Sequence, residues 1–268
     1  MLRTQKTVAE GIELIFSPPL GWLVVDRPKR KNAINRAMWK AIPHAVDQLC
    51  SDQNVRVIVL RGGGEETFIA GADISEFDEV RKDKKTSRSY ERLNDLAFDA
   101  LRNADKPTVA MIRGHCLGGG MALAMACDLR IADGESRFGI PAAKLGVGYP
   151  PKSIADIVAL VGPSVAKDIF FTARQFDGTE ARHLGLINRL VEPGKLEFQT
   201  IALAREIATL APLTQRAAKS AINALVASDF GPAQSDVQTL CDQCFDSHDF
   251  IEGRTAFKEK RRPVFKGS

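Results

Sequence analysis

The 268-residue chain lacks the features that mark several common classes of protein. Its five cysteines, at positions 50, 116, 127, 241 and 244, are odd in number and have no spacing for a complete metal site. Such thiols are typical of a reducing compartment. No apolar run is long enough to span a membrane, and the N-terminus has no secretory apolar segment. We therefore expect a cytoplasmic protein without a metal or a membrane partner.

Two further absences exclude classes of ligand. The net charge is only +4, and apart from residues 29–31 and the C-terminus the basic residues are dispersed, which argues against nucleic-acid binding. The glycines match neither the dinucleotide fingerprint nor the phosphate loop that ends in Gly-Lys-Ser/Thr. What remains, at 44% hydrophobic and 26% charged residues, is typical of a soluble globular chain with one large core.

Patterning divides the chain into two parts. In the first, apolar runs predict strands that alternate with helices, which indicates βαβ units with largely parallel pairing. The expected strands are 12–17 and 20–26 as a hairpin-like pair, then 55–61, 107–113 and 128–132; the expected helices are 36–50, 74–81 and 93–104, with the charged residues 76–92 as solvated helix and a mobile excursion.

The second part has apolar residues at helical spacing and no strand signal. Helices are expected over 196–210, 212–227, 231–246 and 248–259. We therefore predict an α/β core over residues 1–192 and a helical region over 193–268. Its long apolar faces need a partner, either this core or a neighbouring subunit.

One stretch, Gly114–Asp128, holds the strongest chemical signal. Gly118-Gly119-Gly120 joins a predicted strand to a helix, so the backbone can approach a ligand closely and offer free N–H groups to negative charge. A close turn without a ligand is the alternative. A second strand-to-helix loop, residues 68–74, offers similar donors, with Asp73 as a helix cap. Two such loops are what an oxyanion hole needs.

Motifs at intervals along residues 12–266 resemble those of the enoyl-CoA hydratase/isomerase (crotonase) superfamily. They are Arg27-Pro28 with Asn32-Ala33, Phe68 to Ile74, Gly118 to Gly120 with Cys127-Asp128, Gly185-Leu186-Ile187, and Phe257 to Phe265. The resemblance implies a crotonase-like spiral of βαβ units with an all-helical C-terminal trimerisation region. It further implies an acyl-CoA thioester as substrate, no cofactor besides that coenzyme A, and a homotrimer or dimer of trimers.

The same resemblance assigns roles to residues. It implies that the amides of Ala72 and Gly119 hold the thioester oxygen, in agreement with the two-loop argument. The coenzyme contacts that it implies are Lys29, Arg30, Lys31, Ala33, Ala70, Asp73 and Ile74, with Lys260 and Lys266 placed to reach a neighbouring subunit's nucleotide. For the three basic residues, a merely solvated loop is the alternative.

The chain departs from the family's pattern at its acids. A hydratase of this family uses two glutamates, one to activate water and one to handle the proton at the α-carbon. Ala122 and Ala142 stand at those positions here. Pro150, which has no N–H, stands where hydratases tend to have a glycine that helps to hold the water. These departures argue against efficient hydration.

Residues 145–149, Leu-Gly-Val-Gly-Tyr, are similar to methylmalonyl-CoA decarboxylases, in which the residue matching Tyr149 lies in the active site. A phenol there would orient a carboxylate and later help to deliver a proton. The alternative for Tyr149 is a core aromatic whose hydroxyl meets a backbone carbonyl.

Three functions follow. The first is an acyl-CoA lyase that works through a stabilised enolate, with decarboxylase-like chemistry. The second is a hydratase or isomerase whose acid comes from Asp73 or the 76–92 segment, and the third is a catalytically silent acyl-CoA binder. We expect His115 to be packed and hydrogen-bonded, Cys116 and Cys127 to be core residues, and Lys144 to point to solvent.

Overall fold

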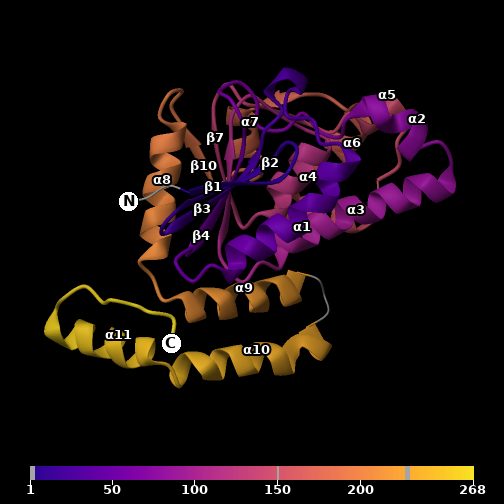
Figure 1. Ribbon diagram of the computed structural model, residues 1–268. Coiled ribbons are helices and arrows are strands. Elements are labelled where there is room, and N and C mark those ends of the chain that lie inside the picture. Colours follow the sequence, from indigo (N-terminus) through magenta and orange to yellow (C-terminus); the bar gives the residue numbers. More distant parts are fainter. Residues whose placement is uncertain (1–3, 150, 227–229) are drawn as a thin grey trace.

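Two β-sheets form the centre of the computed structural model, which describes residues 4–149, 151–226 and 230–268 (Figure 1). The strands of the larger sheet, in spatial order, are β1 (Thr4–Ala9), β2 (Ile12–Ser17), β3 (Leu20–Val25), β4 (Val57–Gly62), β5 (Thr108–Ile112), β7 (Leu129–Asp133) and β10 (Arg189–Val191). The smaller sheet contains β6 (His115–Leu117), β8 (Arg137–Gly139) and β9 (Phe176–Asp177).

Strand direction follows the predicted connections. β2 and β3 form the expected antiparallel pair, whereas β3, β4, β5, β7 and β10 are joined by parallel pairing. β5 is buried along its whole length, which is why it has a continuous apolar run and no alternation. β1 was not predicted, because it is a largely exposed and polar edge strand without an apolar run.

Helices cover both faces of the larger sheet. Those of the α/β part are α1 (Arg36–Ser51), α2 (Phe77–Val80), α3 (Lys84–Arg102), α4 (Gly119–Ala126), α5 (Ala142–Leu145), α6 (Pro151–Thr172) and α7 (Gly178–His183), with short 3₁₀ turns at Pro28–Arg30 and Ile74–Glu76. α8 (Leu196–Ala208) lies along the sheet (Figure 1) and packs Leu203 and Ala204 against side chains such as Trp22 and Val57. The described helices include none long and apolar enough to cross a membrane.

The start of α3 differs from the prediction. The helix expected over 93–104 begins instead at Lys84, and the expected excursion over 76–92 is shorter, because helix already forms at 77–80 and from 84. The reason is local. The Asp83 side chain accepts hydrogen bonds from the amides of Lys85 and Thr86. The Thr86 hydroxyl in turn accepts a hydrogen bond from the Asp83 amide, which completes a capping box.

The C-terminal region is helical, as predicted. α9 (Pro212–Val226), α10 (Phe230–Phe245) and α11 (His248–Glu259) form a layer beyond one end of the sheet (Figure 1). Lys219 holds α9 to the α/β part by donating to Asp128 Oδ2 at 2.9 Å and to two backbone carbonyls. Large apolar side chains of these helices are exposed, among them Ile222, Leu225, Phe245, Ile251 and Phe257.

Candidate active site

A cavity of about 440 Å³ lies among the glycine turn, the loops at 29–33 and 70–74, α3 and residues 141–149. Most of the predicted site residues line it: Lys29, Arg30, Lys31, Ala33, Ala70, Ala72, Asp73, Ile74, Gly119 and Tyr149. Lys260 does not; it is exposed at the end of α11 in the C-terminal layer. The structure therefore brings together residues from four separated stretches of the sequence.

The amide of Ala72 is directed into this space by a short parallel bridge. Ile34 donates its amide hydrogen to Gly71 O, and Asp73 donates to Ile34 O, both at 2.9 Å. In a parallel pair the residue between those two bonds turns its own N–H away from the partner. Gly71 has φ of +109°, a conformation that suits glycine and sets the direction of the loop. Within the described ranges, the Ala72 amide has no acceptor.

The amide of Gly119 comes from the other loop. Gly119 is the first residue of α4, so its N–H has no partner inside the helix. The preceding Gly118 has φ of +51° and ψ of −119°, which turns the chain from β6 into the helix. A methyl group placed on Gly119 would lie 3.7 Å from the Ala72 nitrogen, and one placed on Gly71 would lie 3.6 Å from the Gly119 nitrogen. Two free amides thus lie close together on the cavity wall.

The basic loop at the cavity mouth is shaped by a buried amide side chain. Asn32 is fully buried, with φ of +56°, and its Nδ2 donates to the carbonyls of Gly63 and Thr67 at 3.0 and 2.7 Å. Its Oδ1 accepts from the Arg27 amide. Because Asn32 fixes the loop from inside, Lys29, Arg30 and Lys31 stay exposed at the mouth. Asn32 belongs to the motif that begins at Arg27-Pro28, but this structural role was not predicted from the sequence.

Asp73 has a structural role, as the capping argument predicted. Its Oδ1 accepts from the amide and hydroxyl of Ser75, and its Oδ2 accepts from Arg27 at 2.9 Å. Burial raises the pKa of Asp73, but the hydrogen bonds from Ser75 and Arg27 outweigh that effect and leave the pKa lowered. Asp73 is therefore a charged anchor that ties the Ala72 loop to Arg27.

Replacing Asp73 by asparagine should lower the free energy of unfolding by about 1.5–3 kcal/mol at neutral pH, because a charge-assisted hydrogen bond to Arg27 is lost. A lowered pKa stabilises the fold above the unfolded-state pKa, and this stabilisation is lost as the pH falls through the folded-state value, below 3.8. Urea unfolding of both proteins at pH 7 and pH 3 should show the difference shrink in acid. Lost turnover with intact stability and coenzyme A binding would instead make Asp73 the displaced acid.

Tyr149 lies at the cavity wall beside the glycine turn. Its hydroxyl is 3.6 Å from where a methyl group on Gly118 would be, and its ring packs edge-on against Phe170 at 5.3 Å. Burial raises the pKa of Tyr149 to about 12, so the phenol keeps its proton at neutral pH. The backbone-carbonyl partner of the alternative interpretation is not found among the described residues. Pro150, the next residue, lies outside them.

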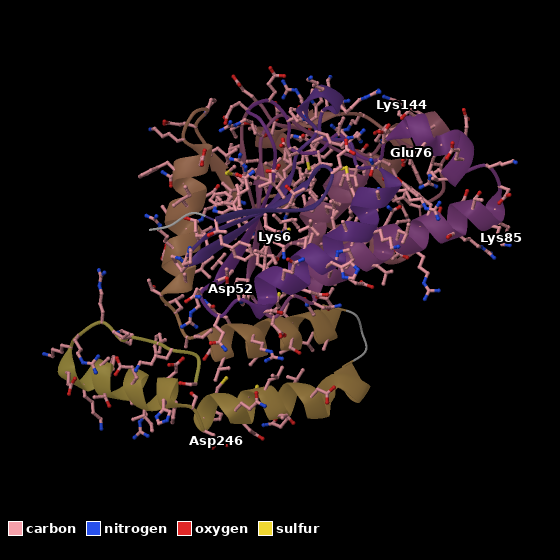
Figure 2. The ribbon with its side chains drawn as sticks, in the orientation of Figure 1. Lys6, Asp52, Glu76, Lys85, Lys144 and Asp246 are labelled. Carbon is pink, nitrogen blue, oxygen red and sulfur yellow. The ribbon has the colours of Figure 1, made fainter. Side chains whose placement is uncertain are left out.

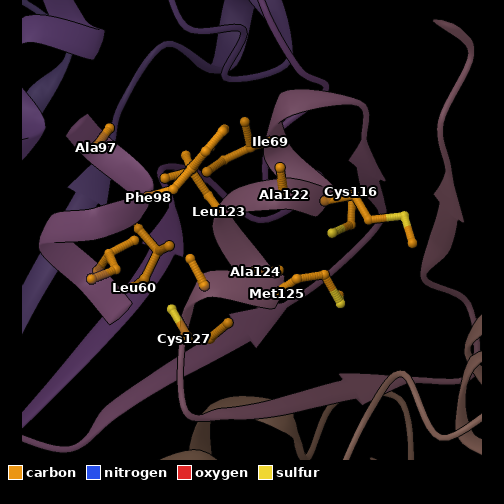
Figure 3. Close-up of a cluster of buried hydrophobic side chains, with 14 of the residues drawn as sticks. Leu60, Ile69, Ala97, Phe98, Cys116, Ala122, Leu123, Ala124, Met125 and Cys127 are labelled. Carbon is orange, nitrogen blue, oxygen red and sulfur yellow. The ribbon is translucent and has the colours of Figure 1, made fainter. Parts of the chain in front are cut away.

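The two alanines of interest lie in different surroundings. Ala122 is 3% exposed on α4, within the buried cluster that includes Cys116 and Cys127 (Figure 3). Ala142 begins α5 and lines the cavity. Both thiols are buried, as predicted, and burial raises the pKa of each. Lys144 is exposed, also as predicted (Figure 2).

His115 differs from its prediction. It was expected to be hydrogen-bonded, but its Nδ1 is buried and has no partner among the described residues. Burial lowers the pKa of His115, and the positive charges of Lys31 and Arg137 lower it further. The lowered pKa favours the neutral imidazole, whose unpaired nitrogen costs less to bury than that of a charged ring.

Two charged cavity residues were not singled out in the sequence, Arg81 and Glu91. They form an ion pair at 3.2 Å, with side chains 17% and 25% exposed. Both belong to the charged stretch that looked like a solvated surface. The helical spacing of Glu91, Asn94 and Phe98, all of which line the cavity, is the signal that was available. The described residues contain no cluster suited to a metal ion.

The two sheets, the βαβ connections and the cavity beside the glycine turn define an α/β protein of the crotonase fold. The family model described as enoyl-CoA hydratase/isomerase matches residues 20–268, and the chain belongs to that family, as the motif resemblance predicted.

The names of similar proteins are consistent with this family. A short-chain-enoyl-CoA hydratase of Clostridium acetobutylicum is 35% identical over 240 residues, which cover 90% of this chain and 91% of that protein. A mitochondrial methylglutaconyl-CoA hydratase of Mus musculus is 34% identical over 91% of this chain and 79% of its own. A crystal structure described as an enoyl-CoA hydratase/carnithine racemase from Magnetospirillum magneticum superposes with a TM-score of 0.93 at 34% identity, covering 98% of this chain and 97% of that one.

Proposed function

We propose that the protein is an acyl-CoA lyase that stabilises an enolate through the amides of Ala72 and Gly119, with decarboxylase-like chemistry in place of hydration. The observation that carries this proposal is the pair of free amides, close together on the wall of a cavity that Ala142 lines, in a chain that also has alanine, Ala122, at the other position where an acid is expected. Donors fixed where charge develops contribute about 3–4 kcal/mol each to the transition state. They suffice for an enolate but do not move a proton.

The missing carboxyls argue against hydration. Adding water to a double bond needs one group that takes a proton from water and one that gives a proton to carbon. The methyl groups of Ala122 and Ala142 do neither, and Ala122 is enclosed in the core. The relatives reported above are named as hydratases, and the basis for proposing a different reaction here is that Ala122 and Ala142 stand where the family resemblance leads us to expect glutamates.

Loss of CO₂ is the reaction that the remaining groups fit. The bond between the α-carbon and a carboxylate of the acyl group breaks, its electron pair forms the enolate, and CO₂ leaves. The thioester oxygen gains negative charge beside the two amides. A proton then adds to the α-carbon. In the proposal the Tyr149 phenol, which lies on the cavity wall, donates this proton, and the resulting phenolate takes a proton from water. Incubation with methylmalonyl-CoA should release CO₂ and propionyl-CoA, whereas brisk hydration of crotonyl-CoA that responds to changes at Ala122 or Ala142 would refute the proposal.

Replacing Tyr149 by phenylalanine should lower the rate of decarboxylation about 10²-fold, the contribution typical of a positioned proton donor. The fold should persist, because the hydroxyl has no bond with another described residue. Since the pKa of Tyr149 is about 12, ionisation of the phenol should not reduce the wild-type rate between pH 7 and 10. Stopped assays of CO₂ release across this range test both points, and an unchanged rate in the variant would leave Tyr149 a packing residue.

A hydratase or isomerase with a displaced acid is the second candidate, and the structure adds a specific residue to it. Glu91 lies in the 76–92 segment and lines the cavity, whereas the carboxylate of Asp73 is bound to Arg27 and Ser75. Glu91→Gln with intact coenzyme A binding and lost isomerisation would favour this candidate. Tight binding of acyl-CoA without turnover of a broad panel would favour a silent binder.

Two further features of the proposal concern binding and assembly. The coenzyme would lie along the loop of Lys29, Arg30 and Lys31, whose exposed cations suit phosphate groups. The exposed apolar side chains of α9–α11 would be buried in a homotrimer or a dimer of trimers, where Lys260 would reach a neighbouring subunit's nucleotide. We infer a cytoplasmic location from the cysteine usage.

A further inference from the structure

The ion pair of Arg81 and Glu91 at the cavity wall includes a candidate residue for substrate specificity. We propose that Arg81 recognises a carboxylate on the acyl group, so that the substrate is an acyl-CoA that bears a second acid. This inference rests on the proposed function, since it takes the cavity as the acyl-CoA site.

Arg81 is held rigidly. Its guanidinium carbon lies 5.2 Å from the ring centres of both Phe77 and Tyr90. Tyr90 is itself fixed, because its hydroxyl accepts a hydrogen bond from Trp39 Nε1 at 2.9 Å. A guanidinium in contact with two aromatic rings, one of them anchored, has less rotational freedom to lose when a ligand arrives, which favours selective binding.

Arg81 has donors to spare. A guanidinium carries five N–H groups in a fixed fork. Among the described residues its polar contact is the one with Glu91 Oε1, made by Nη1 at 3.2 Å, and Nε is enclosed without a partner. The side chain is 17% exposed and lines the cavity, so part of the fork faces the space that a ligand would occupy.

The surroundings favour an anion of the acyl part. Phe77 lies beside Arg81, the cavity wall also includes Trp39 and Phe98, and a charge beside apolar groups is attracted to its counter-ion more strongly than in water. The cations suited to phosphates, Lys29 to Lys31, are on the 29–33 loop. Arg81 instead lies near Tyr149, whose pKa its charge lowers against the larger effect of burial. A carboxylate on the acyl group would therefore meet Arg81 beside the proposed proton donor.

The proposal predicts opposite effects for the removal of Glu91 and of Arg81. The Glu91 carboxylate competes with a ligand carboxylate for the Arg81 guanidinium and offsets part of its positive charge. Removing the charge of Glu91 should strengthen the attraction of Arg81 for a ligand carboxylate, whereas removing Arg81 should abolish it. A pair with a purely structural role would respond to both changes in the same direction.

The test compares the affinity for an acyl-CoA that bears a carboxylate with that for a neutral analogue in which a methyl group replaces the carboxylate. Methylmalonyl-CoA is paired with isobutyryl-CoA, and succinyl-CoA with butyryl-CoA, so the two pairs locate the carboxylate on the α-carbon or further along. Rapid-mixing fluorescence of Trp39, which lines the cavity, reports binding before turnover. We expect the acid of at least one pair to bind about tenfold more tightly in the wild type, as for one charge-assisted hydrogen bond. Arg81→Met should bring that ratio to about one, and Glu91→Gln should raise it severalfold.

Arg88→Met is the matched control, since Arg88 is an exposed arginine of α3 that does not line the cavity, and its ratio should equal that of the wild type. Equal affinities within both pairs in the wild type would overturn the inference. A fall of the ratio in both Arg81→Met and Glu91→Gln would also overturn it, as would an equal loss of affinity for free coenzyme A in Arg81→Met. In those cases turnover through Ala72 and Gly119 stands as a separate result. Failure of every acyl-CoA to bind would refute the proposed function and this inference together.

Discussion

Replacing Gly119 by alanine should reduce acyl-CoA turnover by about 10²–10³-fold, the loss that follows removal of one oxyanion donor. The added methyl group would lie 3.7 Å from the Ala72 nitrogen, in the space between the two amides where the thioester oxygen is proposed to bind. It would thus occupy space beside the Ala72 donor without removing either amide. The helix itself accepts alanine, because Gly119 does not have a positive φ.

The packing cost of this change is smaller than its catalytic cost. The methyl group would lie 3.0 Å from Trp39 Cζ2, so the indole has to move by a few tenths of an ångström. The ring is held by its bond to Tyr90 and by an edge contact with Phe98 at 5.6 Å, which limits that movement. We expect a loss of about 1–3 kcal/mol in the free energy of unfolding, typical of overpacking.

Steady-state kinetics with urea unfolding of the same samples separates the two effects. Gly134→Ala is the control: Gly134 has no positive φ, lies outside the cavity and has its nearest neighbour, Thr179 Oγ1, 4.0 Å from the new methyl group. Turnover by Gly119→Ala at the wild-type rate would show that the thioester oxygen binds elsewhere.

The sequence permitted prediction of the amide donors because their placement depends on local chain geometry. A glycine-rich turn between a strand and a helix leaves free N–H groups whatever the side chains nearby, so the two donor-bearing loops could be predicted, while the resemblance to the crotonase superfamily pointed to Ala72 and Gly119 within them. The parallel strands were predictable for a similar reason, since buried strands such as β5 show continuous apolar runs.

Arg81 and Glu91 were missed because tertiary packing decides their environment. A run of charges predicts a solvated surface. The helical spacing of Glu91, Asn94 and Phe98 indicates a shared helix face, but not that α3 packs against α1 with this face beside a cavity. His115 was misjudged in a related way: that its neighbours are Lys31 and Arg137 depends on how distant segments meet. Local sequence thus predicts which backbone amides are free to donate, whereas the neighbours of a side chain depend on how distant segments pack in the fold.

The third glycine of the turn has a different role from the second. A methyl group on Gly120 would lie 2.2 Å from the carbonyl oxygen of Ile69 and 2.8 Å from its side chain. That carbonyl accepts from the Leu117 amide at 3.0 Å, and Ile69 is fully buried, so the clash is with fixed backbone and not with a flexible side chain. Relief requires α4 to move away from the 68–74 loop, which carries Ala72.

Gly120→Ala should therefore lower the free energy of unfolding by about 3 kcal/mol or more, at the high end for a single substitution. Because the movement separates the two amide-bearing segments, any protein that still folds should also lose turnover, although the added methyl group is outside the cavity lining. Urea unfolding and kinetics on Gly120→Ala, with Gly134→Ala again as the control, measure both effects. A stable Gly120→Ala protein with wild-type turnover would show that the contact between α4 and Ile69 does not set the distance between the donors.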